Sequence, residues 1–342
     1  MPWSRPVPSP SARLLGLVVA VALLTACSSE GDDADAAVAG GDGVFPVTVE
    51  HAFGTTTVES EPTRIVTAGV TEQDAVLALG VVPVGITDWY GEQPHAVWPW
   101  AQDELGDAEP TVLSSADGLQ FEAIAAVEPD LIVATNAGLT EDDYAKLSEI
   151  APTVAHSDDD YFEPWDTQAL AIGTAMGKEA EVRELIADVQ GQFADAAAAH
   201  PEFAGTPAAF LQNAVYDGDL IAYQEGLSTA FLTDLGFTVP ASLDAFATEG
   251  QAFVPLEQAS VLDDADVLIW GTEADGDRAA LEELGVYRAL EAVQGGHLVF
   301  TGPVLAGAIY FTSLLSLPYV LDELVPLLEA AVAGAPSTVP AD

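Results

Sequence analysis

Residues 64–86 read RIVTAGVTEQDAVLALGVVPVGI, and this stretch decides the fold class. Short apolar runs at Arg64–Thr67 and Val84–Ile86 are typical of buried strands. The segment between them, Thr71–Ala78, carries apolar residues at helical spacing. A strand, a helix and a second strand in this order predict a parallel sheet that is covered by helices.

The same alternation continues along the first half of the chain. Thr71 is the expected N-cap of the first helix, because Asp74 follows three residues later in a weaker relative of the capping box. The next elements are predicted, in order, as a helix at Phe121–Val127, a strand at Asp130–Ala134, a helix at Glu141–Ile150 and a strand at Thr153–Ala155. Ahead of them, Val47–His51 and Thr55–Glu59 alternate around Phe53-Gly54 and indicate a β-hairpin.

A long helical segment at 178–200 interrupts this alternation of strands and helices. Its apolar residues recur at helical spacing without an internal proline, which predicts a helix roughly 35 Å long. The second half then repeats the order of the first, since ALGVVP at 78–83 resembles DLGFTVP at 234–240. We therefore expect two similarly built α/β lobes joined by the helix. The uncharged stretch Val304–Leu321 has membrane length, but its polar residues favour a helix packed under the second lobe.

The N-terminal residues are typical of a secretory signal. Arg5 and Arg13 are the only charged side chains before Cys27, and Leu14–Leu24 is an apolar run. The cysteine is the only one in the chain and ends the sequence Leu-Thr-Ala-Cys, which resembles a bacterial lipobox. Cys27 is therefore the predicted lipidation site. A single cysteine excludes a disulfide framework, so stability must come from a packed core.

These observations divide the chain into segments with different roles. We expect a signal peptide at 1–26, an acidic flexible tether at 27–44, an N-terminal lobe at 45–177, a linking helix at 178–200, a C-terminal lobe at 201–332 and a tail at 333–342.

The charge of the chain restricts its partners. Removing the signal leaves six lysines and arginines against 55 acids. A phosphate backbone needs a basic surface, so nucleic acid is excluded as a partner. An anionic ligand would be repelled, and few cations are available to hold it.

The lipobox, the two lobes, the linking helix and the paired motifs together resemble the substrate-binding lipoproteins of iron–siderophore ABC importers. The stretches that carry the resemblance are ALGVVPVG at 78–85, FEAIAAVEPDLIVA at 121–134, IAPTVA at 150–155 and LSLPYVLDEL at 315–324. The resemblance implies two Rossmann-like α/β lobes with parallel central sheets, joined by one long rigid helix. This is the class III periplasmic-binding-protein architecture. It also implies an extracytoplasmic, lipid-anchored protein that works with an ABC permease and is not an enzyme.

Two carboxylates gain a role from this resemblance. In the family, one glutamate on each lobe faces arginine pockets of the permease, and the matching positions are Glu122 and Glu257. Each is also expected in the first turn of a helix, where the helix dipole favours an acid. The two readings are compatible, because an exposed carboxylate is a suitable partner for arginine.

Aromatic residues cluster near the predicted strand ends, where open parallel sheets bind ligands. Residues 86–100 (ITDWYGEQPHAVWPW) hold three of the tryptophans. Rings supply large apolar area with a polar handle, which suits a bulky organic ligand. The predicted ligand-binding residues are Trp89, Tyr90, Trp100, Asn136, Tyr216, Tyr223 and Trp270. Packing in the core is the alternative for several of these rings.

The acidic charge favours a neutral or cationic ferric hydroxamate of the ferrioxamine type over an anionic catecholate or citrate complex. The iron would arrive inside the siderophore, so we expect no protein metal ligand and no cofactor. We expect a monomer. Cobalamin or haem binding on the same fold is the main alternative.

Direct capture of zinc or manganese is a further alternative, although the histidines show no paired spacing. They are His51, His95, His156, His200 and His297. An enzyme is disfavoured because the chain lacks a GxSxG elbow, an HExxH motif and a Walker A loop.

Overall fold

The computed structural model describes residues 44–88, 91–116, 118–157, 163–248 and 250–338. A hairpin comes first, as expected, with β1 Val47–His51 pairing antiparallel to β2 Gly54–Val58. Its turn is Ala52-Phe53, one residue earlier than the expected Phe53-Gly54, because Gly54 pairs with His51. Residues 42–342 form one compact unit, which contains this two-stranded sheet and two larger sheets, of five and seven strands.

The N-terminal lobe is built on a five-stranded sheet in the order β5-β4-β3-β6-β7, in which every pair is parallel. Its strands are β3 Ile65–Thr67, β4 Gly85–Asp88, β5 Thr111–Ser114, β6 Leu131–Ala134 and β7 Thr153–Ala155. Its helices are α1 Glu72–Ala78, α2 Gln102–Leu105, α3 Phe121–Ala126, α4 Glu141–Ser148 and α5 Trp165–Ala175, with 3₁₀ turns η1 Pro94–Ala96 and η2 Pro99–Ala101. Helices α1 and α5 pack on one face of the sheet, and α3 and α4 pack on the other.

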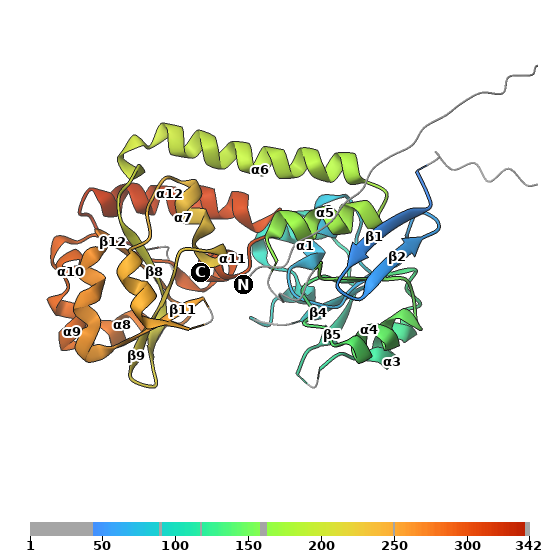
Figure 1. The fold of residues 1–342 in the computed structure, drawn as a ribbon, viewed down its shortest axis with the longest axis horizontal. Coiled ribbons are helices and arrows are strands. Elements are labelled where there is room, and N and C mark those ends of the chain that lie inside the picture. The colour runs from blue at the N-terminus through green and yellow to red at the C-terminus, as the bar shows by residue number, and fades with distance from the viewer. Residues whose placement is uncertain (1–43, 89–90, 117, 158–162, 249, 339–342) are drawn as a thin grey trace, which may run out of the picture. The chain divides into compact units, whose positions relative to one another are not determined.

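One helix, α6 Glu179–Ala199, runs from this lobe to the next along the top of the view (Figure 1). The helix predicted at 178–200 is thereby confirmed. Its buried side chains, Val182, Val189 and Phe193, belong to a single apolar cluster that also contains core residues of both lobes. Because the lobes share one continuous core through α6, the link between them resists bending.

The C-terminal lobe has a seven-stranded mixed sheet in the order β10-β11-β9-β8-β12-β13-β14. Its strands are β8 Ala208–Tyr216, β9 Asp219–Tyr223, β10 Ala247–Thr248, β11 Gln251–Pro255, β12 Val267–Gly271, β13 Leu298–Phe300 and β14 Ser337–Thr338. Its helices are α7 Ala230–Asp234, α8 Asp275–Glu283, α9 Gly285–Ala289, α10 Glu291–Gly295, α11 Gly302–Tyr310 and α12 Ser316–Val332. Its 3₁₀ segments are η3 Pro201–Phe203, η4 Leu227–Thr229, η5 Ala241–Phe246 and η6 Leu256–Asp264.

The expectation of a parallel sheet in both lobes is wrong for the second. Strands β8 and β9 form an antiparallel hairpin, and β9, β11 and β10 continue antiparallel. The turn between β8 and β9 is Asp217-Gly218, and both residues have positive φ, 50° and 96°. An Asp-Gly pair with this geometry is the preferred two-residue hairpin turn. The two-lobed α/β fold is confirmed, with an antiparallel half added to its second sheet.

The C-terminal residues also differ from expectation. The uncharged stretch is divided between α11 and α12, with a break at 311–315, and both helices pack against the second sheet. Residues Ser337–Thr338, assigned to a tail, form β14 and pair in parallel with β13. In the part of the chain described here, no helix is long and apolar enough to span a membrane.

Candidate functional site at the lobe junction

Two loops at the carboxyl edge of the first sheet are fixed by one buried carboxylate. Glu72 accepts hydrogen bonds from the amides of Gly69 (2.7 Å) and Asn136 (2.7 Å), which follow β3 and β6. A Cβ atom on residue 69 would lie 2.4 Å from the carbonyl carbon of Asn136, so only glycine fits there. Burial raises the pKa of Glu72 to about 8, and the two amide donors oppose that rise.

Asn136, one of the predicted ligand residues, belongs to this pair of loops. Its side-chain Nδ2 donates to the carbonyl of Val70 (3.2 Å), and the residue is half-buried. The amide group therefore braces the neighbouring loop, and the residue stands at the expected edge of the sheet. Its ligand contact stays a prediction.

Thr71 is the N-cap residue of α1, as expected, but its side chain does not cap the helix. Thr71 has a left-handed φ of 68°, and its hydroxyl donates to the carbonyl of Val70 rather than capping α1. Asp74 does not reach back to Thr71 with its side chain. The capping-box prediction is wrong because both side chains have other partners.

Asp74 instead joins the two lobes. Its Oδ2 accepts from Trp100 Nε1 (2.8 Å) and from Ser313 Oγ (2.5 Å), which lies between α11 and α12 of the second lobe. Its Oδ1 accepts from Gln73 Nε2 (3.1 Å). The carboxylate is 0% exposed. Burial raises its pKa to about 6, while these donors lower it and Glu104 adds repulsion.

Part of the ring-rich stretch packs into this junction. Trp98 and Trp100 stack with ring centroids 4.9 Å apart, and Trp100 lies 6.0 Å from the ring of Tyr319 on α12. Trp98 is 2% exposed. The contacts of Trp100 with other protein groups explain its position in the junction. Its ligand contact stays a prediction. Trp89 and Tyr90 lie outside the described residues, as does Cys27.

A small pocket opens between the lobes beside this network. It is lined by Thr71, Glu72, Trp165 and Gln168 of the first lobe and by Thr312 to Leu314 of the second, and its volume is about 10 Å³. That volume holds one water at most. The pocket is part of the packed junction and is too small for an organic ligand.

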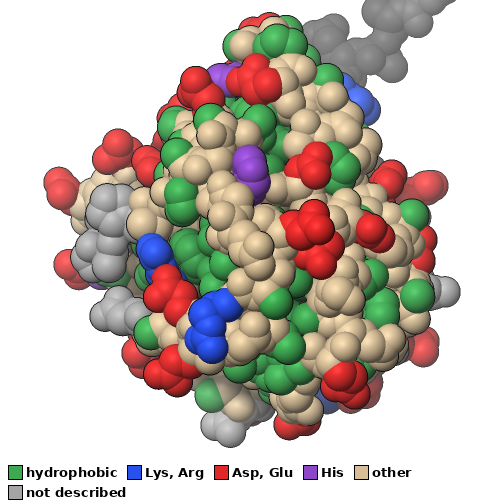
Figure 2. Space-filling view, turned by 90° about the vertical axis from the view of Figure 1, so that its left-hand side faces the viewer, with side chains coloured by type: hydrophobic (Ala, Val, Ile, Leu, Met, Phe, Trp, Pro, Cys, Tyr) green, Lys and Arg blue, Asp and Glu red, His purple; other side chains and the backbone are tan. Residues whose placement is uncertain are grey.

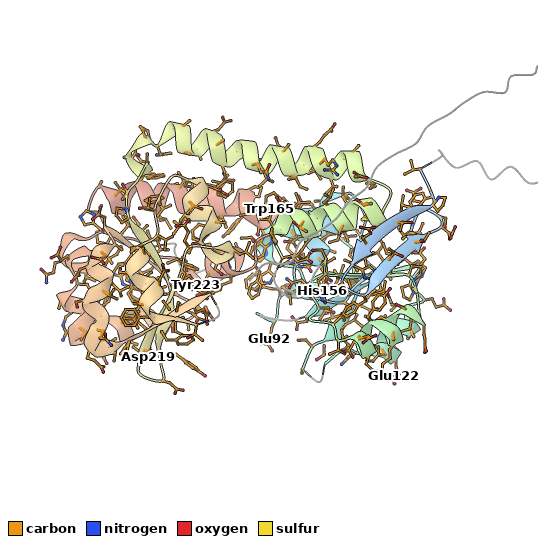
Figure 3. The ribbon with its side chains drawn as sticks, in the orientation of Figure 1. Glu92, Glu122, His156, Trp165, Asp219 and Tyr223 are labelled. Carbon is orange, nitrogen blue, oxygen red and sulfur yellow. The ribbon has the colours of Figure 1, made fainter. Side chains whose placement is uncertain are left out.

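A second group of rings gathers in the C-terminal lobe. Tyr223 stacks on Phe210 (5.1 Å) and lies 6.1 Å from Tyr310 of α11. Tyr310 Oη donates to the carbonyl of Gly271 at the end of β12 (3.1 Å). Tyr223 is only 8% exposed, and it lies in the middle region of Figure 3 with Trp165 of the first lobe. The structure thus brings Tyr223 and Tyr310 together.

Two predicted ligand residues are placed away from this group. Trp270 is 0% exposed and packs on Tyr287, so the ring is part of the core, and its ligand contact stays a prediction. Tyr216 is 65% exposed at the tip of the β8–β9 hairpin. Because β8 and β9 run antiparallel, Tyr216 and Tyr223 lie at opposite ends of the hairpin and cannot form one surface.

The charges around the junction are mainly acidic. Asp88 ends β4, and burial together with Glu92 raises its pKa. All six lysines and arginines beyond Cys27 lie in the described residues and have partners elsewhere. Arg64 bonds carbonyls of Val127 and Glu128, Lys146 pairs with Asp142, Lys178 with Glu181, Arg183 with Glu179, Arg278 with Glu282, and Arg288 bonds carbonyls of Glu282 and Glu283. On the face drawn in Figure 2, acids are spread widely and basic side chains are few.

Glu122 and Glu257 occupy comparable places in the two lobes. Each lies in the first turn of its helical segment, α3 or η6, and both side chains are exposed. The segment at Glu257 is 3₁₀ rather than α-helical, with Pro255 as its N-cap. In Figure 3, Glu122 lies at the lower edge of the first lobe, as Asp219 does on the second. Their meeting with a permease stays a prediction.

The histidines give direct metal capture no support. His51 Nε2 bonds Thr56 Oγ1 (2.9 Å), and its ring lies 5.0 Å from that of Tyr144. Burial and the nearby His156 lower the pKa of His51. Within the described ranges, no group of three or more His, Cys, Asp or Glu residues is arranged to hold a metal ion.

Comparison with known proteins agrees with this arrangement of lobes and helix. The sequence profile of the periplasmic binding protein family matches residues 65–305. The chain belongs to that family. A relative from Escherichia coli (strain K12), the Fe(3+) dicitrate-binding periplasmic protein FecB, is 30% identical over 66% of this chain and 72% of its own. The ferric enterobactin-binding periplasmic protein FepB of Escherichia coli O6:H1 is 29% identical over 60% of this chain and 67% of its own. These relatives are binding proteins, not enzymes.

Solved structures of family members share the fold. A periplasmic solute binding protein from Mycobacterium smegmatis is 49% identical and superposes with a TM-score of 0.79, covering 84% of this chain and 98% of its own. PiaA of Streptococcus pneumoniae, solved in complex with ferrichrome, is 29% identical with a TM-score of 0.71, covering 84% and 99%. The class III architecture, with two lobes and one linking helix, is therefore confirmed.

Proposed function

We propose that this protein captures a ferric siderophore outside the cytoplasm and delivers it to an ABC permease. The favoured ligand is a neutral or cationic ferric hydroxamate of the ferrioxamine type. The observation that carries this choice is the engagement of all six available lysines and arginines with carboxylates or carbonyls of the chain itself. An anionic ferric complex would need some of these bonds to break.

The names of the relatives support siderophore capture without deciding the charge of the ligand. FecB and FepB are named for ferric dicitrate and ferric enterobactin, whereas PiaA was solved with ferrichrome. The ligand supplies its own iron coordination, so the protein need only bind the organic shell. Tyr310 is half-buried beside Tyr223 and offers apolar area for that purpose, and Tyr223 supports it from behind.

Attachment and delivery complete the proposal. Lipid on Cys27 would hold the protein, as a monomer, at the outer surface of the cell membrane. Glu122 and Glu257 would meet basic pockets of the permease, one from each lobe, as two exposed carboxylates can.

A titration of the unlipidated protein tests the proposal through tryptophan fluorescence. The ligands are ferrioxamine, ferrichrome, a ferric catecholate, ferric citrate, haem, cobalamin and Zn²⁺, each organic ligand with its metal-free control. Submicromolar binding of the hydroxamates supports the proposal. Tight binding of the catecholate or citrate complex alone overturns the charge argument. Binding of haem or cobalamin alone reassigns the ligand on the same fold, and binding of Zn²⁺ alone overturns siderophore capture.

A further inference from the structure

One buried carboxylate holds groups from three separate parts of the chain. Asp74 lies in the first turn of α1, and its donors come from its neighbour Gln73, from Trp100 of the ring-rich stretch and from Ser313 of the second lobe. Ser313 is 239 residues away in sequence. The bond to Ser313 is the shortest of the three, at 2.5 Å. A single side chain therefore fixes contacts both within the first lobe and between the lobes.

The partner turn in the second lobe is itself held in place. Ser313 Oγ accepts from the amide of Ser316 (3.0 Å), while the amide of Ser313 donates to Ser316 Oγ (2.8 Å). Ser316 Oγ also donates to the carbonyl of Phe311 (3.3 Å). The turn that joins α11 to α12 thus presents the Ser313 hydroxyl in a fixed direction, which makes its bond to Asp74 geometrically demanding.

Helix α11 connects this turn to the rings of the second lobe. Its residue Gly307 lies directly against Trp98, which stacks on Trp100. Its last residue, Tyr310, contacts Phe210 and Tyr223 and bonds the carbonyl of Gly271. A shift of the turn at Ser313 would therefore move both aromatic groups relative to each other.

Among the described residues, no cationic side chain bonds to this carboxylate. Its three hydrogen-bond donors are neutral, and the charged group that acts on it, Glu104, has the same sign. A buried anion without a cation costs stability, so packing alone does not favour an aspartate at this position.

We propose that Asp74 is a positioning residue for ligand capture, which sets the orientation of the two lobes and their aromatic surfaces through its bonds to Trp100 and Ser313. The inference rests on the proposed function for its ligand but not for its geometry. A preorganised cleft binds more tightly, because less freedom is lost when the ligand enters.

The choice of variants depends on one buried acceptor atom of Gln73. Gln73 Oε1 is buried and has no hydrogen-bond partner. In Asp74→Asn, the amide oxygen can accept from Trp100 and Ser313, while its NH₂ donates to Gln73 Oε1 after that amide turns over. This variant keeps the three contacts, whereas Asp74→Ala removes them all and Ser313→Ala removes the contact between lobes. Leu147→Ala, in the core on the far side of the first sheet, is the control for lost stability alone.

The experiment measures the distance between the lobes directly. The chain has one cysteine, Cys27, so a mature protein that starts after it can carry spin labels at Thr57→Cys and Ser260→Cys alone, on exposed sites in different lobes. Asp74→Ala and Ser313→Ala should broaden or shift the label-to-label distance and weaken ferrioxamine binding roughly tenfold. Asp74→Asn and Leu147→Ala should leave both readouts near those of the parent.

Each result decides the inference. An unchanged distance in Asp74→Ala overturns it, whichever ligand binds. A changed distance with unchanged affinity overturns the role in capture. If Asp74→Asn fails as Asp74→Ala does, the contacts described here are not the cause. If no siderophore binds the parent protein, the proposed function fails, and the distances still decide whether Asp74 couples the lobes.

Discussion

The indole of Trp98, in the N-terminal lobe, packs against Gly307 of α11 in the C-terminal lobe, where a Cβ atom on residue 307 would lie 2.6 Å from ring atom Cη2. The same ring lies against Gly91, where a Cβ atom would be 2.9 Å from ring atom Cζ2. The ring is therefore in close contact with glycines from both lobes, and it is 2% exposed.

Replacing Gly307 with alanine should separate the lobes locally. The added methyl group must displace a fully packed indole, so we expect Gly307→Ala to lower the free energy of unfolding by about 1–3 kcal/mol. Chemical denaturation measures the change. Gly191→Ala in α6 is the matched control, because a Cβ atom there meets nothing within 4 Å, and alanine should stabilise the helix by up to about 1 kcal/mol. Trp98→Phe should relieve part of the clash, and additive losses in the double variant would contradict this packing.

Glu72 should make stability depend on pH near neutrality. Its pKa rises from an ordinary value of 4.5 to about 8 on folding, so the folded protein binds more protons than the unfolded chain between these values. The free energy of unfolding should then fall as pH rises through that window, by on the order of 5 kcal/mol in total. Glu72→Gln cannot ionise, and its NH₂ cannot accept from one of the two amides that the carboxyl oxygens hold. It should therefore be less stable than the parent near pH 5, but its stability should not fall as pH rises. Parallel curves for the two proteins from pH 5 to 9 would contradict the assignment.

Much of the first lobe could be predicted from the sequence, because its elements are marked locally. The apolar run 65–67, the helix after Thr71 and the strand at 131–134 each carry their own periodicity, and the 21-residue α6 carries it for six turns. The two-residue Asp217-Gly218 turn was an equally local signal of the β8–β9 hairpin. The hairpin was not predicted, because the second half of the chain was expected to repeat the parallel sheet of the first lobe.

The junction could not be predicted, because its partners are distant in sequence. The spacing from Thr71 to Asp74 is the same for a capping box and for a carboxylate that faces Ser313, and only the fold distinguishes them. Trp270 poses a similar problem. Strand β12 is buried along its whole length, so a ring near its end is buried on either face of the sheet. Strand ends alone therefore do not identify ligand residues.

Reversing the charge of the two exposed glutamates should separate transport from binding. Glu122→Lys and Glu257→Lys should leave the siderophore Kd within about twofold, since both side chains lie on the surface, yet lower uptake in cells by roughly tenfold or more through lost arginine contacts. Glu149→Lys, at the exposed end of α4, is the control for a change of charge alone. Loss of a negative charge in the first helical turn should lower the free energy of unfolding by about 0.5–1 kcal/mol at each site, and unfolding curves measure this change. Uptake equal to that of the parent protein would exclude the docking role.

The dependence of binding on salt should reveal whether the acidic surroundings select the ligand. Between about 0.01 M and about 1 M salt the Debye length shrinks from about 30 Å to about 3 Å, so attraction between exposed charges is largely removed. Cationic ferrioxamine should bind several-fold more weakly at the higher concentration, whereas neutral ferrichrome should bind equally at both. Asp88→Asn removes a partly buried carboxylate at the carboxyl edge of the first sheet, which should weaken ferrioxamine at low salt and flatten its response. If both ligands respond to salt in the same way, the protein itself changes with salt. If ferrioxamine binding does not depend on salt, the charge of the ligand plays no part in recognition.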